Sequence, residues 1–382
     1  MKNISSIIVF LFVGLLLAVP FQDPTAAEAT TAAKKTNPAG LATEWDNLVS
    51  AAQKEGTIVI YSNQPPAVRN TIIPAFKEKY KINVEFSPGR PAELVAKLQQ
   101  ERRAGLNLVD IGLFGGTTFI NDLIPTGICQ PLEPLLVLPE VKDPRNWSIG
   151  RLPFLDKGKT AILMVMMANS FYQRNIDLVK ENEISSSQDL LNPKWKEKIV
   201  MSDPGISGAA NSWFTWMLTE IMGKEKGLQF MKDLVAQKPA VTRDERQLTE
   251  GLAKGKFHIS IGPSMSVPAE FIQMGAPIAF IDVKEPRSLS PGFGIIGVFK
   301  DAPHSQAAKL FLNWILTREG SSIYAPAVKY ASLRADVSTK GILPIMVPRP
   351  NDVYPEWKYE KYGQIQGEMR KLAAEVFAPL AK

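Results

Sequence analysis

The feature of this sequence that most constrains its fold is a regular alternation of β-rich runs with segments of helical periodicity. Three β-rich runs, Thr57–Tyr61, Ile82–Phe86 and Leu108–Phe114, lie in the first third of the chain. Between the first two, apolar residues recur at every fourth position from Val68 to Tyr80, which is helical spacing. Strands separated by helices predict βαβ units and a parallel sheet.

The same alternation restarts after a proline-rich stretch at 132–153, which indicates a second α/β unit. The chain has 382 residues, more than an ordinary domain of about 100–200 residues. The further predicted strands are Ala161–Met167, Lys198–Met201, Phe257–Ile261, Pro277–Ile281 and Ile295–Phe299. The further predicted helices are Trp213–Met222, a helix from Ala307 to Arg318 that Gly320 ends, and Tyr359–Phe377. We therefore expect two α/β lobes.

The chain is predicted to cross between these lobes more than once. Lobe one is predicted to comprise 44–158 and 284–325, and lobe two 159–283. The last segment, 326–382, is predicted to pack across or beside lobe one. Crossing segments of this kind permit two lobes to close like a hinge around a ligand.

The N-terminus has the pattern of a secretory signal peptide. An almost unbroken apolar run, Ile7–Val19, is shorter than the roughly 20 residues of a membrane span. Ala27 and Ala29 fit a small-residue cleavage site. We therefore predict a cleavable signal peptide over 1–29, a flexible leader over 30–43 and a periplasmic mature protein. An uncleaved N-terminal anchor is the alternative.

Composition excludes several other classes of protein. The net charge is +6, but lysine and arginine are scattered among acidic residues, as in the run Lys77-Glu78-Lys79. That pattern is typical of solvated helix faces and argues against nucleic-acid binding. The single cysteine, Cys129, excludes an intramolecular disulfide. No other apolar run approaches the length of a membrane span, so we expect the mature chain to be soluble.

Small and polar residues follow the predicted strands, where ligands bind in open α/β sheets. Glycine lets backbone N–H groups approach a ligand, and a helix N-terminus adds unpaired donors and positive potential. The candidate ligand-binding residues are Ser62, Asn63, Arg90, Gly116 and Thr117 in lobe one, and Asp203, Ser207, Gly208, Arg243 and Ser264 in lobe two. Ordinary turn and capping chemistry at each loop is the alternative interpretation.

Two arginines in this set suggest the class of ligand. Arg90 precedes a predicted helix in lobe one, and Arg243 lies at a predicted strand end in lobe two. Arginine holds carboxylate, sulfate or phosphate through paired N–H donors, so a small anion could bridge the lobes. Both could instead form surface ion pairs, and Asp244 beside Arg243 weakens the case. A neutral polyol held by Asn63, Asp203 and aromatic side chains is the competing hypothesis.

Motifs for catalysis are absent or out of context. The run from Gly292 to Gly297 matches G-x-G-x-x-G, but a β-rich run overlaps it where a nucleotide-binding helix would have to begin. No G-x-x-x-x-G-K-[ST] occurs, and neither Ser207 nor Ser264 stands in G-x-S-x-G. We therefore predict a binding protein without a cofactor rather than an enzyme. An enzyme or a sensor subunit on the same two-lobed scaffold remains the alternative.

Several segments resemble the extracellular solute-binding proteins of iron(III)-type ABC importers. They are Glu44–Thr57, Ile73–Tyr80, Asp189–Lys196, Ala302–Gly320 and Ser332–Val337. The resemblance implies a periplasmic-binding-protein-like fold with two α/β lobes around a central cleft and strands that cross a hinge. It also implies delivery of a small-molecule ligand to an ABC permease in the membrane. We expect a monomer.

The same comparison argues against iron. Family members that bind ferric ion use a histidine after the first strand and adjacent tyrosines in the second lobe. In this chain the corresponding residues, 62–66 and 262–266, include neither histidine nor tyrosine. Ferric ion requires anionic oxygen ligands, which serine and backbone do not supply. His258, inside a predicted strand, and His304, expected at the surface, do not form a metal site by themselves. We predict no bound metal.

Overall fold

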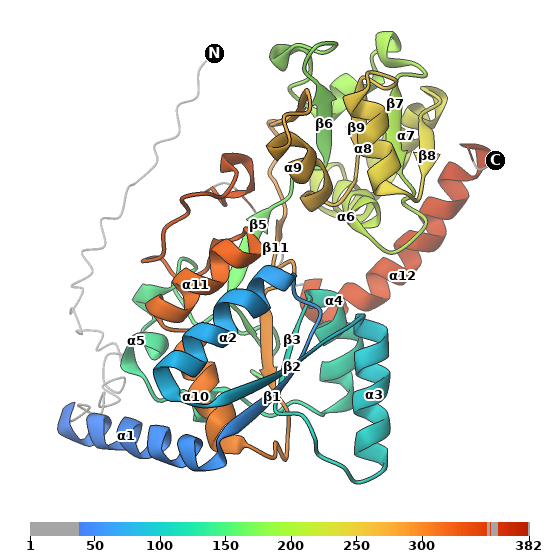
Figure 1. The fold of residues 1–382 in the computed structure, drawn as a ribbon. Coiled ribbons are helices and arrows are strands. Elements are labelled where there is room, and N and C mark those ends of the chain that lie inside the picture. Colours follow the sequence, from blue (N-terminus) through green and yellow to red (C-terminus); the bar gives the residue numbers. More distant parts are fainter. Residues whose placement is uncertain (1–37, 350–351, 353–357, 381–382) are drawn as a thin grey trace, which may run out of the picture.

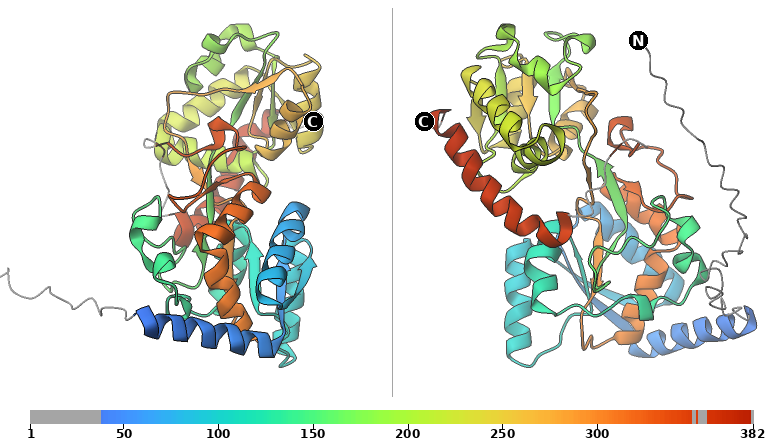
Figure 2. Two further views of the ribbon diagram at one scale, coloured as in Figure 1. Left: turned by 60° about the vertical axis from the view of Figure 1, so that its left-hand side comes forward. Right: turned by 180° about the vertical axis from the view of Figure 1, so that it is seen from behind.

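The computed structural model describes residues 38–349, 352 and 358–380, and these form two α/β lobes, one above the other in Figure 1. Each lobe contains a five-stranded sheet flanked by helices, and a three-stranded sheet lies between the lobes. The two further views in Figure 2 show the same division. This is the two-lobed α/β class that the alternation in the sequence predicts.

The sheet of lobe one is mixed rather than wholly parallel. Its strands are β1 (Thr57–Ser62), β2 (Asn83–Pro88), β3 (Ile111–Phe114), β4 (Ile162–Leu163) and β12 (Ile295–Val298). Their order is β2-β1-β3-β12-β4. β1 pairs in parallel with β2 and β3, as predicted, whereas β12 pairs antiparallel with β3 and β4. The difference arises because β12 returns to this sheet from the other lobe, with no βαβ crossover to orient it.

The sheet of lobe two is also mixed. Its strands are β6 (Tyr172–Asn175), β7 (Ile199–Ser202), β8 (Ala240–Thr242), β9 (Ile259–Ile261) and β10 (Ile278–Phe280), in the order β10-β6-β9-β7-β8. β7 is parallel to β8 and β9, and β6 is antiparallel to β9 and β10. The sequence did not predict β6, whose two middle residues are the polar Gln173 and Arg174.

Three short strands lie between the lobes, and two of them connect the lobes. They are β5 (Val165–Ala168), β11 (Leu289–Ser290) and β13 (Ala331–Ser332), and β5 pairs antiparallel with both others. β5 leads into lobe two and β11 leads back. The pairing of β4 with β12 places β4 in lobe one, beyond the predicted boundary at 158. Glu285 accepts a hydrogen bond from the Ser187 N–H of lobe two, so the predicted return at 284 is too early.

Ten helices of the described residues have eight or more residues. They are α1 (Pro38–Glu55), α2 (Pro66–Tyr80), α3 (Pro91–Arg103), α6 (Ala209–Trp216), α7 (Lys224–Ala236), α8 (Glu245–Ala253), α9 (Ser266–Gln273), α10 (Ser305–Ile315), α11 (Arg318–Val328) and α12 (Lys358–Phe377). Shorter helices are α4 (Gly116–Thr118), which continues as a π-turn over Phe119–Leu123, and α5 (Pro139–Lys142). The prediction that Gly320 ends a helix was wrong. Thr317 Oγ1 accepts a hydrogen bond from the Gly320 N–H and so begins α11 there.

The last helix packs mainly on lobe two, not on lobe one as predicted. Ala373 and Phe377 of α12 are buried in the hydrophobic core of lobe two, where the Phe377 ring lies 6.4 Å from that of Phe214. Gln366 Nε2 donates to Ser212 Oγ at 3.4 Å. α12 also contacts the π-turn of lobe one, and Figures 1 and 2 show it extending from one lobe to the other. The apolar residues of this helix therefore complete a core whose first member in the sequence is Phe171.

The predicted signal peptide lies outside the described residues, as does most of the predicted leader. α1 begins at Pro38, so residues 38–43 are helical rather than part of a flexible leader. Among the described helices, none combines the length and the apolar character that crossing a membrane requires.

Candidate functional site

Lobe one brings the ends of three neighbouring strands together at one edge of its sheet. The Asn63 N–H donates to the Leu113 carbonyl at 3.3 Å, and the Gly89 N–H donates to the Ser62 carbonyl at 3.1 Å. These bonds join the loops that follow β1, β2 and β3. Ser62 and Asn63 therefore lie beside the turn that carries Arg90.

A buried glutamine that the sequence did not single out fixes the first of these loops. Gln64 Nε2 donates to the Phe293 carbonyl, and the Tyr324 hydroxyl donates to Gln64 Oε1 at 3.0 Å. Burial raises the pKa of Tyr324, so its hydroxyl stays protonated and available as a donor. The only signal in the sequence was the position of Gln64 beside Asn63 in a candidate loop.

Glycines allow the loop after β3 to pack closely against the turn before β12. The Gly116 N–H donates to the Gly292 carbonyl at 3.4 Å, and a Cβ on Gly115 would lie 3.1 Å from that same carbonyl oxygen. Gly292 itself has φ +51°, and a Cβ there would lie 2.4 Å from the Tyr330 ring. Only glycine fits such a position. The G-x-G-x-x-G match is thus a turn that opens β12, which confirms the predicted strand and leaves no helix for a nucleotide.

The other two candidates in lobe one are exposed. Arg90 is the residue before α3, its side chain is 85% exposed, and its Nη1 lies 3.4 Å from Glu93 Oε1. Pro91 occupies the first turn of α3. Thr117 is exposed in α4. Neither Arg90 nor Thr117 is held in place by the buried bonds that fix Ser62.

Lobe two presents an ion pair at the corresponding edge of its sheet. The Asp203 N–H donates to the Thr242 carbonyl at 3.0 Å, which joins the ends of β7 and β8. Arg243 Nε lies 3.0 Å from Asp203 Oδ2, while Asp203 Oδ1 accepts from the Gly205 N–H at 2.8 Å. The Arg243 side chain is 74% exposed and that of Asp203 only 19%. The carboxylate is therefore fixed and the guanidinium projects from it.

Asp244, the neighbour expected to weaken the case for Arg243, has a different role. Its side chain caps α8 by accepting from the Gln247 N–H at 2.9 Å. The next residue, Glu245, accepts from Ser264 Oγ at 3.1 Å. The structure thus brings Ser264 to the same corner of lobe two as Arg243.

The loops after β7 and β9 meet at the start of α6. Ser207 and Gly208 are exposed and directly precede this helix. Gly262 follows β9 with φ +76°, and a Cβ there would lie 2.8 Å from the Ala210 Cβ. This close approach places the loop that carries Ser264 against the first turn of α6.

Three buried polar atoms at these strand and helix ends have no hydrogen-bond partner among the described residues. They are Asn63 Oδ1, Ser202 Oγ and Asn211 Oδ1. Asn211 uses its amide group to donate to the Pro204 carbonyl at 3.0 Å, which leaves its oxygen without a donor. An unsatisfied buried polar group costs about 1–3 kcal/mol, so each atom would gain from a ligand or water that offers an O–H or N–H.

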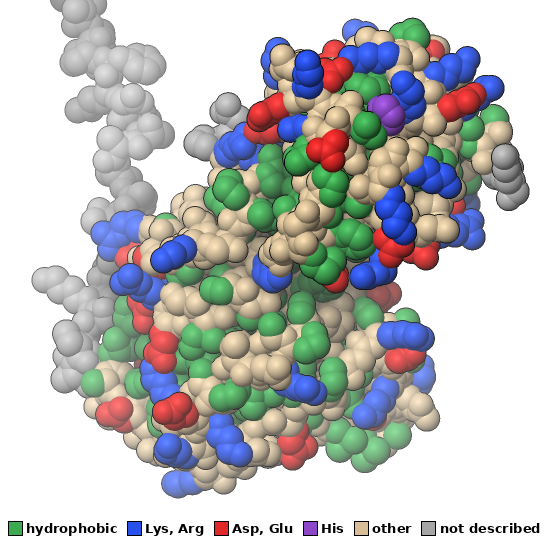
Figure 3. Space-filling model, turned by 45° about the horizontal axis from the view of Figure 1, so that its top comes forward, with side chains coloured by type: hydrophobic (Ala, Val, Ile, Leu, Met, Phe, Trp, Pro, Cys, Tyr) green, Lys and Arg blue, Asp and Glu red, His purple; other side chains and the backbone are tan. Residues whose placement is uncertain are grey.

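The two sets of loops face each other across the space between the lobes. Figure 1 shows α4 and the start of α3 on the side of lobe one that faces lobe two, and α6 on the opposing side of lobe two. The surface of the molecule is narrower between the lobes than across either lobe (Figure 3). Each lobe assembles its own candidates, but no contact joins the candidates of one described lobe to those of the other.

Histidines take structural positions. His304 Nδ1 lies 2.9 Å from the buried carboxylate of Asp110, at the start of α10, and not freely at the surface as expected. His258 lies beside Trp195, with ring centroids 6.3 Å apart. Within residues 38–349, 352 and 358–380, no group of three or more His, Cys, Asp or Glu side chains could hold a metal ion.

Comparison with known proteins identifies the family. The model of the bacterial extracellular solute-binding proteins matches residues 71–344, which is more than two thirds of the chain. The chain belongs to this family. This solute-binding protein is the component of an ABC importer that captures the substrate. An uncharacterized protein of Haemophilus influenzae is 23% identical over 280 residues, or 72% of this chain and 76% of that protein.

Solved structures share the fold at low sequence identity. An extracellular solute-binding protein from Bordetella parapertussis has a TM-score of 0.67 and 14% identity, over 86% of this chain and 100% of the other. The Trichodesmium protein IdiA (FutA), in complex with iron and citrate, has a TM-score of 0.65 and 19% identity, over 84% and 99%. AfuA from Actinobacillus pleuropneumoniae, with bound fructose-6-phosphate, has a TM-score of 0.59 and 19% identity, over 85% and 99%. The periplasmic-binding-protein fold is thereby established.

Proposed function

We propose that this protein captures a small organic anion that also carries hydroxyl groups, such as a sugar phosphate or hydroxycarboxylate. The solute binds between the lobes, which close around it and present it to the membrane permease. The predicted signal peptide over 1–29 delivers the chain to the periplasm, where it acts as a monomer.

The observation that carries this proposal is the ion pair between Arg243 and Asp203. Asp203 engages Arg243 through Nε and leaves the two terminal nitrogens of an exposed guanidinium for an incoming group. A guanidinium offers paired donors that match the geometry of a carboxylate or phosphate. Arg90 is the corresponding exposed cation in lobe one.

The buried acceptor atoms support the hydroxyl groups of the proposed solute. Asn63 Oδ1 in lobe one and Asn211 Oδ1 in lobe two can only accept hydrogen bonds. A fully ionised inorganic anion such as sulfate has no donor for them, whereas a sugar or hydroxycarboxylate donates through its hydroxyl groups. The fructose-6-phosphate of AfuA is a molecule of this kind, held by a protein of the same fold.

We propose further that the solute is not ferric ion. Residues 62–66 and 262–266 supply serine, amide and backbone groups instead of the anionic oxygens that ferric ion requires. The nearby carboxylates of Asp203 and Glu245 are engaged by Arg243 and Ser264. Elemental analysis of the purified protein should find no stoichiometric iron, and one iron per chain that survives mild chelation would contradict this part of the proposal.

Titration calorimetry tests the anion site. A panel of phosphate, citrate, fructose-6-phosphate and fructose is screened on the wild type, and the tightest ligand is measured on the variants. Hydrogen bonds to charged groups contribute about 1.5–3 kcal/mol, so Arg243→Ala should weaken binding roughly 10- to 100-fold. Arg246→Ala is the matched control, because Arg246 is exposed on α8 and pairs with Glu250 and Glu270. Unchanged affinity in both Arg90→Ala and Arg243→Ala would refute the anion bridge.

A further inference from the structure

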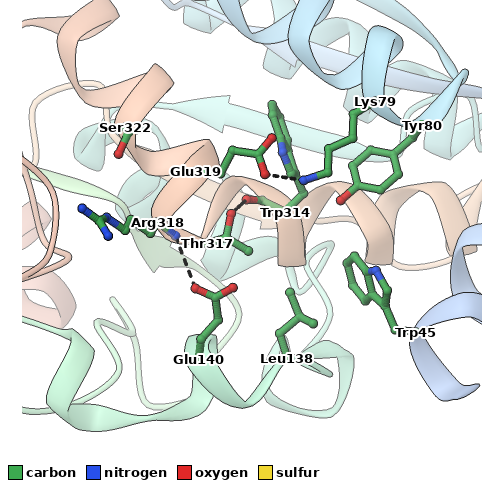
Figure 4. Close-up of a pocket in the computed structure, with 10 residues that line it drawn as sticks. All are labelled: Trp45, Lys79, Tyr80, Leu138, Glu140, Trp314, Thr317, Arg318, Glu319 and Ser322. Carbon is green, nitrogen blue, oxygen red and sulfur yellow. Dashed lines mark hydrogen bonds and ion pairs between the residues drawn. The ribbon is translucent and has the colours of Figure 1, made fainter. Parts of the chain in front are cut away.

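A second concave site lies wholly within lobe one, away from the strand ends that form the interlobe site. It is a pocket of about 560 Å³ between α1, α2, α5, α10 and α11 (Figure 4). A volume of this size is ordinary for a small-molecule site. Because no residue of lobe two lines it, closure of the lobes does not act on it directly.

Aromatic side chains form one side of the pocket. Trp45 of α1 and Tyr80 of α2 pack edge to face, with ring centroids 6.4 Å apart. Trp314 of α10 is fully buried behind them, and Leu138 adds an aliphatic wall. The Tyr80 hydroxyl points into the space between Trp45 and Leu138 (Figure 4). It makes no hydrogen bond to another described residue, which leaves it available to a ligand.

Two carboxylates from different helices flank this aromatic wall. Glu140 of α5 and Glu319 of α11 are 46% and 50% exposed. Glu140 Oε2 lies 3.4 Å from Arg334 Nη2 and accepts from the Arg318 N–H at 3.5 Å. Burial raises the pKa of Tyr80 most, and the negative charges of Glu319 and Glu140 raise it further. Both carboxylates therefore act on the hydroxyl at the centre of the pocket.

Each carboxylate of the pocket already has one basic partner, and in both cases the contact uses Oε2, so Oε1 of Glu140 and Oε1 of Glu319 have no partner among the described residues. The Lys79 ammonium is paired with Glu319 and lies 5.6 Å from the centroid of the Tyr80 ring. The Arg318 side chain extends away from Trp45 and Tyr80 (Figure 4). Lys79 thus already shows how this site holds an ammonium group, between an aromatic face and a carboxylate.

We infer that this pocket is a second ligand site, specific for a small organic cation: an ammonium group attached to an apolar or aromatic body. The ammonium donates to Glu140 and to the Tyr80 hydroxyl, while the body packs against Trp45 and Leu138. Attraction of a cation to the face of tryptophan or tyrosine adds to both contacts. The ligand differs in charge from the anion proposed for the interlobe site, so the two sites are chemically distinct.

Ligand-observed NMR and calorimetry test this inference with a matched pair of probes on the full mature chain. The probes are 2-phenylethylammonium and 2-phenylethanol, which have the same body and differ in charge. We expect 2-phenylethylammonium to bind at least about tenfold more tightly, because a charge-assisted hydrogen bond to a carboxylate is lost in the alcohol. Glu140→Gln should remove about the same factor, and Glu78→Gln, an exposed carboxylate on α2 outside the pocket, should change nothing.

A second variant keeps the test decisive if Glu140→Gln perturbs the fold through Arg334. Trp45→Leu keeps an apolar wall but removes the aromatic face on which the shared body packs, so it should weaken both probes severalfold. Equal affinity for the two probes, no binding at millimolar concentration, or binding that survives both Glu140→Gln and Trp45→Leu would each overturn the inference. Binding of the ammonium probe should persist in Arg243→Ala, which separates this site from the interlobe site.

Discussion

The loops that we propose as the solute site differ in kind between the two lobes. In lobe one, the loops are closed by hydrogen bonds and glycine contacts that leave little freedom, as at Gln64 and Gly292. In lobe two, the corresponding loops carry an ion pair between the exposed Arg243 and the largely buried Asp203, and a serine–carboxylate contact. Around Ser62 and Gly116, lobe one therefore offers a preformed surface, whereas Arg243 of lobe two is a side chain that could exchange partners with a solute.

This difference suggests how closure is driven. A ligand shifts a protein toward a closed state only through contacts that exist mainly in that state. The fixed loops of lobe one can hold a solute before closure at little further entropic cost. The guanidinium of lobe two then gains its second partner only when the lobes approach. The cores differ as well, because the core of lobe two includes Phe377 from the far end of the chain.

The largest expected effect concerns that distant segment. Phe377→Ala should lower the free energy of unfolding of lobe two by about 3–5 kcal/mol, since it removes a buried aromatic ring that packs near Phe214. Denaturant unfolding followed by fluorescence checks this, because Trp195, Trp213 and Trp216 all lie in the core of lobe two. The control is Glu375→Ala on the exposed face of α12, expected within about 0.5 kcal/mol of wild type. Equal stability of the two variants would mean that α12 is not part of the lobe.

The next effect tests the closed loops of lobe one. Gln64→Ala should cost about 1–3 kcal/mol, because it leaves the buried Tyr324 hydroxyl without a partner and removes one of the two hydrogen bonds to the Phe293 carbonyl. Adding Tyr324→Phe to this variant should recover part of the loss, since the orphaned hydroxyl is removed. Thermal unfolding of the two single variants and the double variant measures the coupling. If the losses of stability in the two single variants simply add up in the double variant, Gln64 does not fix the loop through Tyr324.

A smaller effect separates the two hypotheses for the solute. Asp203→Asn removes a negative charge from beside Arg243. If the solute is an anion, its affinity should rise about two- to fivefold, the size of an exposed charge interaction. If the solute is a neutral polyol that donates to Asp203, its affinity should fall instead. The sign of the change in Kd, measured by calorimetry, decides between them.

The smallest effect is a dependence of stability on pH. The backbone N–H of Ser185, followed by that of Ser186, holds the pKa of Asp189 below its ordinary value. A lowered pKa stabilises the fold above the unfolded value of about 4, and this stability is lost as the pH falls through the folded value. Asp189→Asn should therefore flatten the acid dependence of lobe-two unfolding below about pH 4. Asp177→Asn, at an exposed position of the same lobe, should leave that dependence as in wild type.

Much of the fold could be predicted from local pattern. The β-rich runs gave β1, β2, β3, β7, β9, β10 and β12 to within a few residues, since each is bounded by turn residues. β6 escaped because polar residues are buried in it: Gln173 is fully buried and accepts from Ser260 Oγ at 2.6 Å. The lobe boundaries were misplaced because strand pairing, which composition does not reveal, decides them.

The candidate site was predictable in location but not in its internal contacts. Rules for strand ends pointed to the loops that carry Asn63, Asp203 and Arg243. They could not reveal which aspartate pairs with Arg243. Asp244 is its neighbour in the sequence but caps α8, whereas Asp203, 40 residues earlier, forms the ion pair. The roles of Gln64 and Gly292 in fixing the loops of lobe one were likewise missed, since their partners are more than 30 residues away in the chain.

The most direct test of the account is small-angle scattering of the mature chain, alone and saturated with its solute. The solute is first identified by native mass spectrometry of the protein as purified. We predict one solute per chain and a smaller radius of gyration in the complex, because the fixed loops of lobe one and the cation of lobe two meet across it. Stoichiometric binding with an unchanged radius of gyration would contradict closure around the solute.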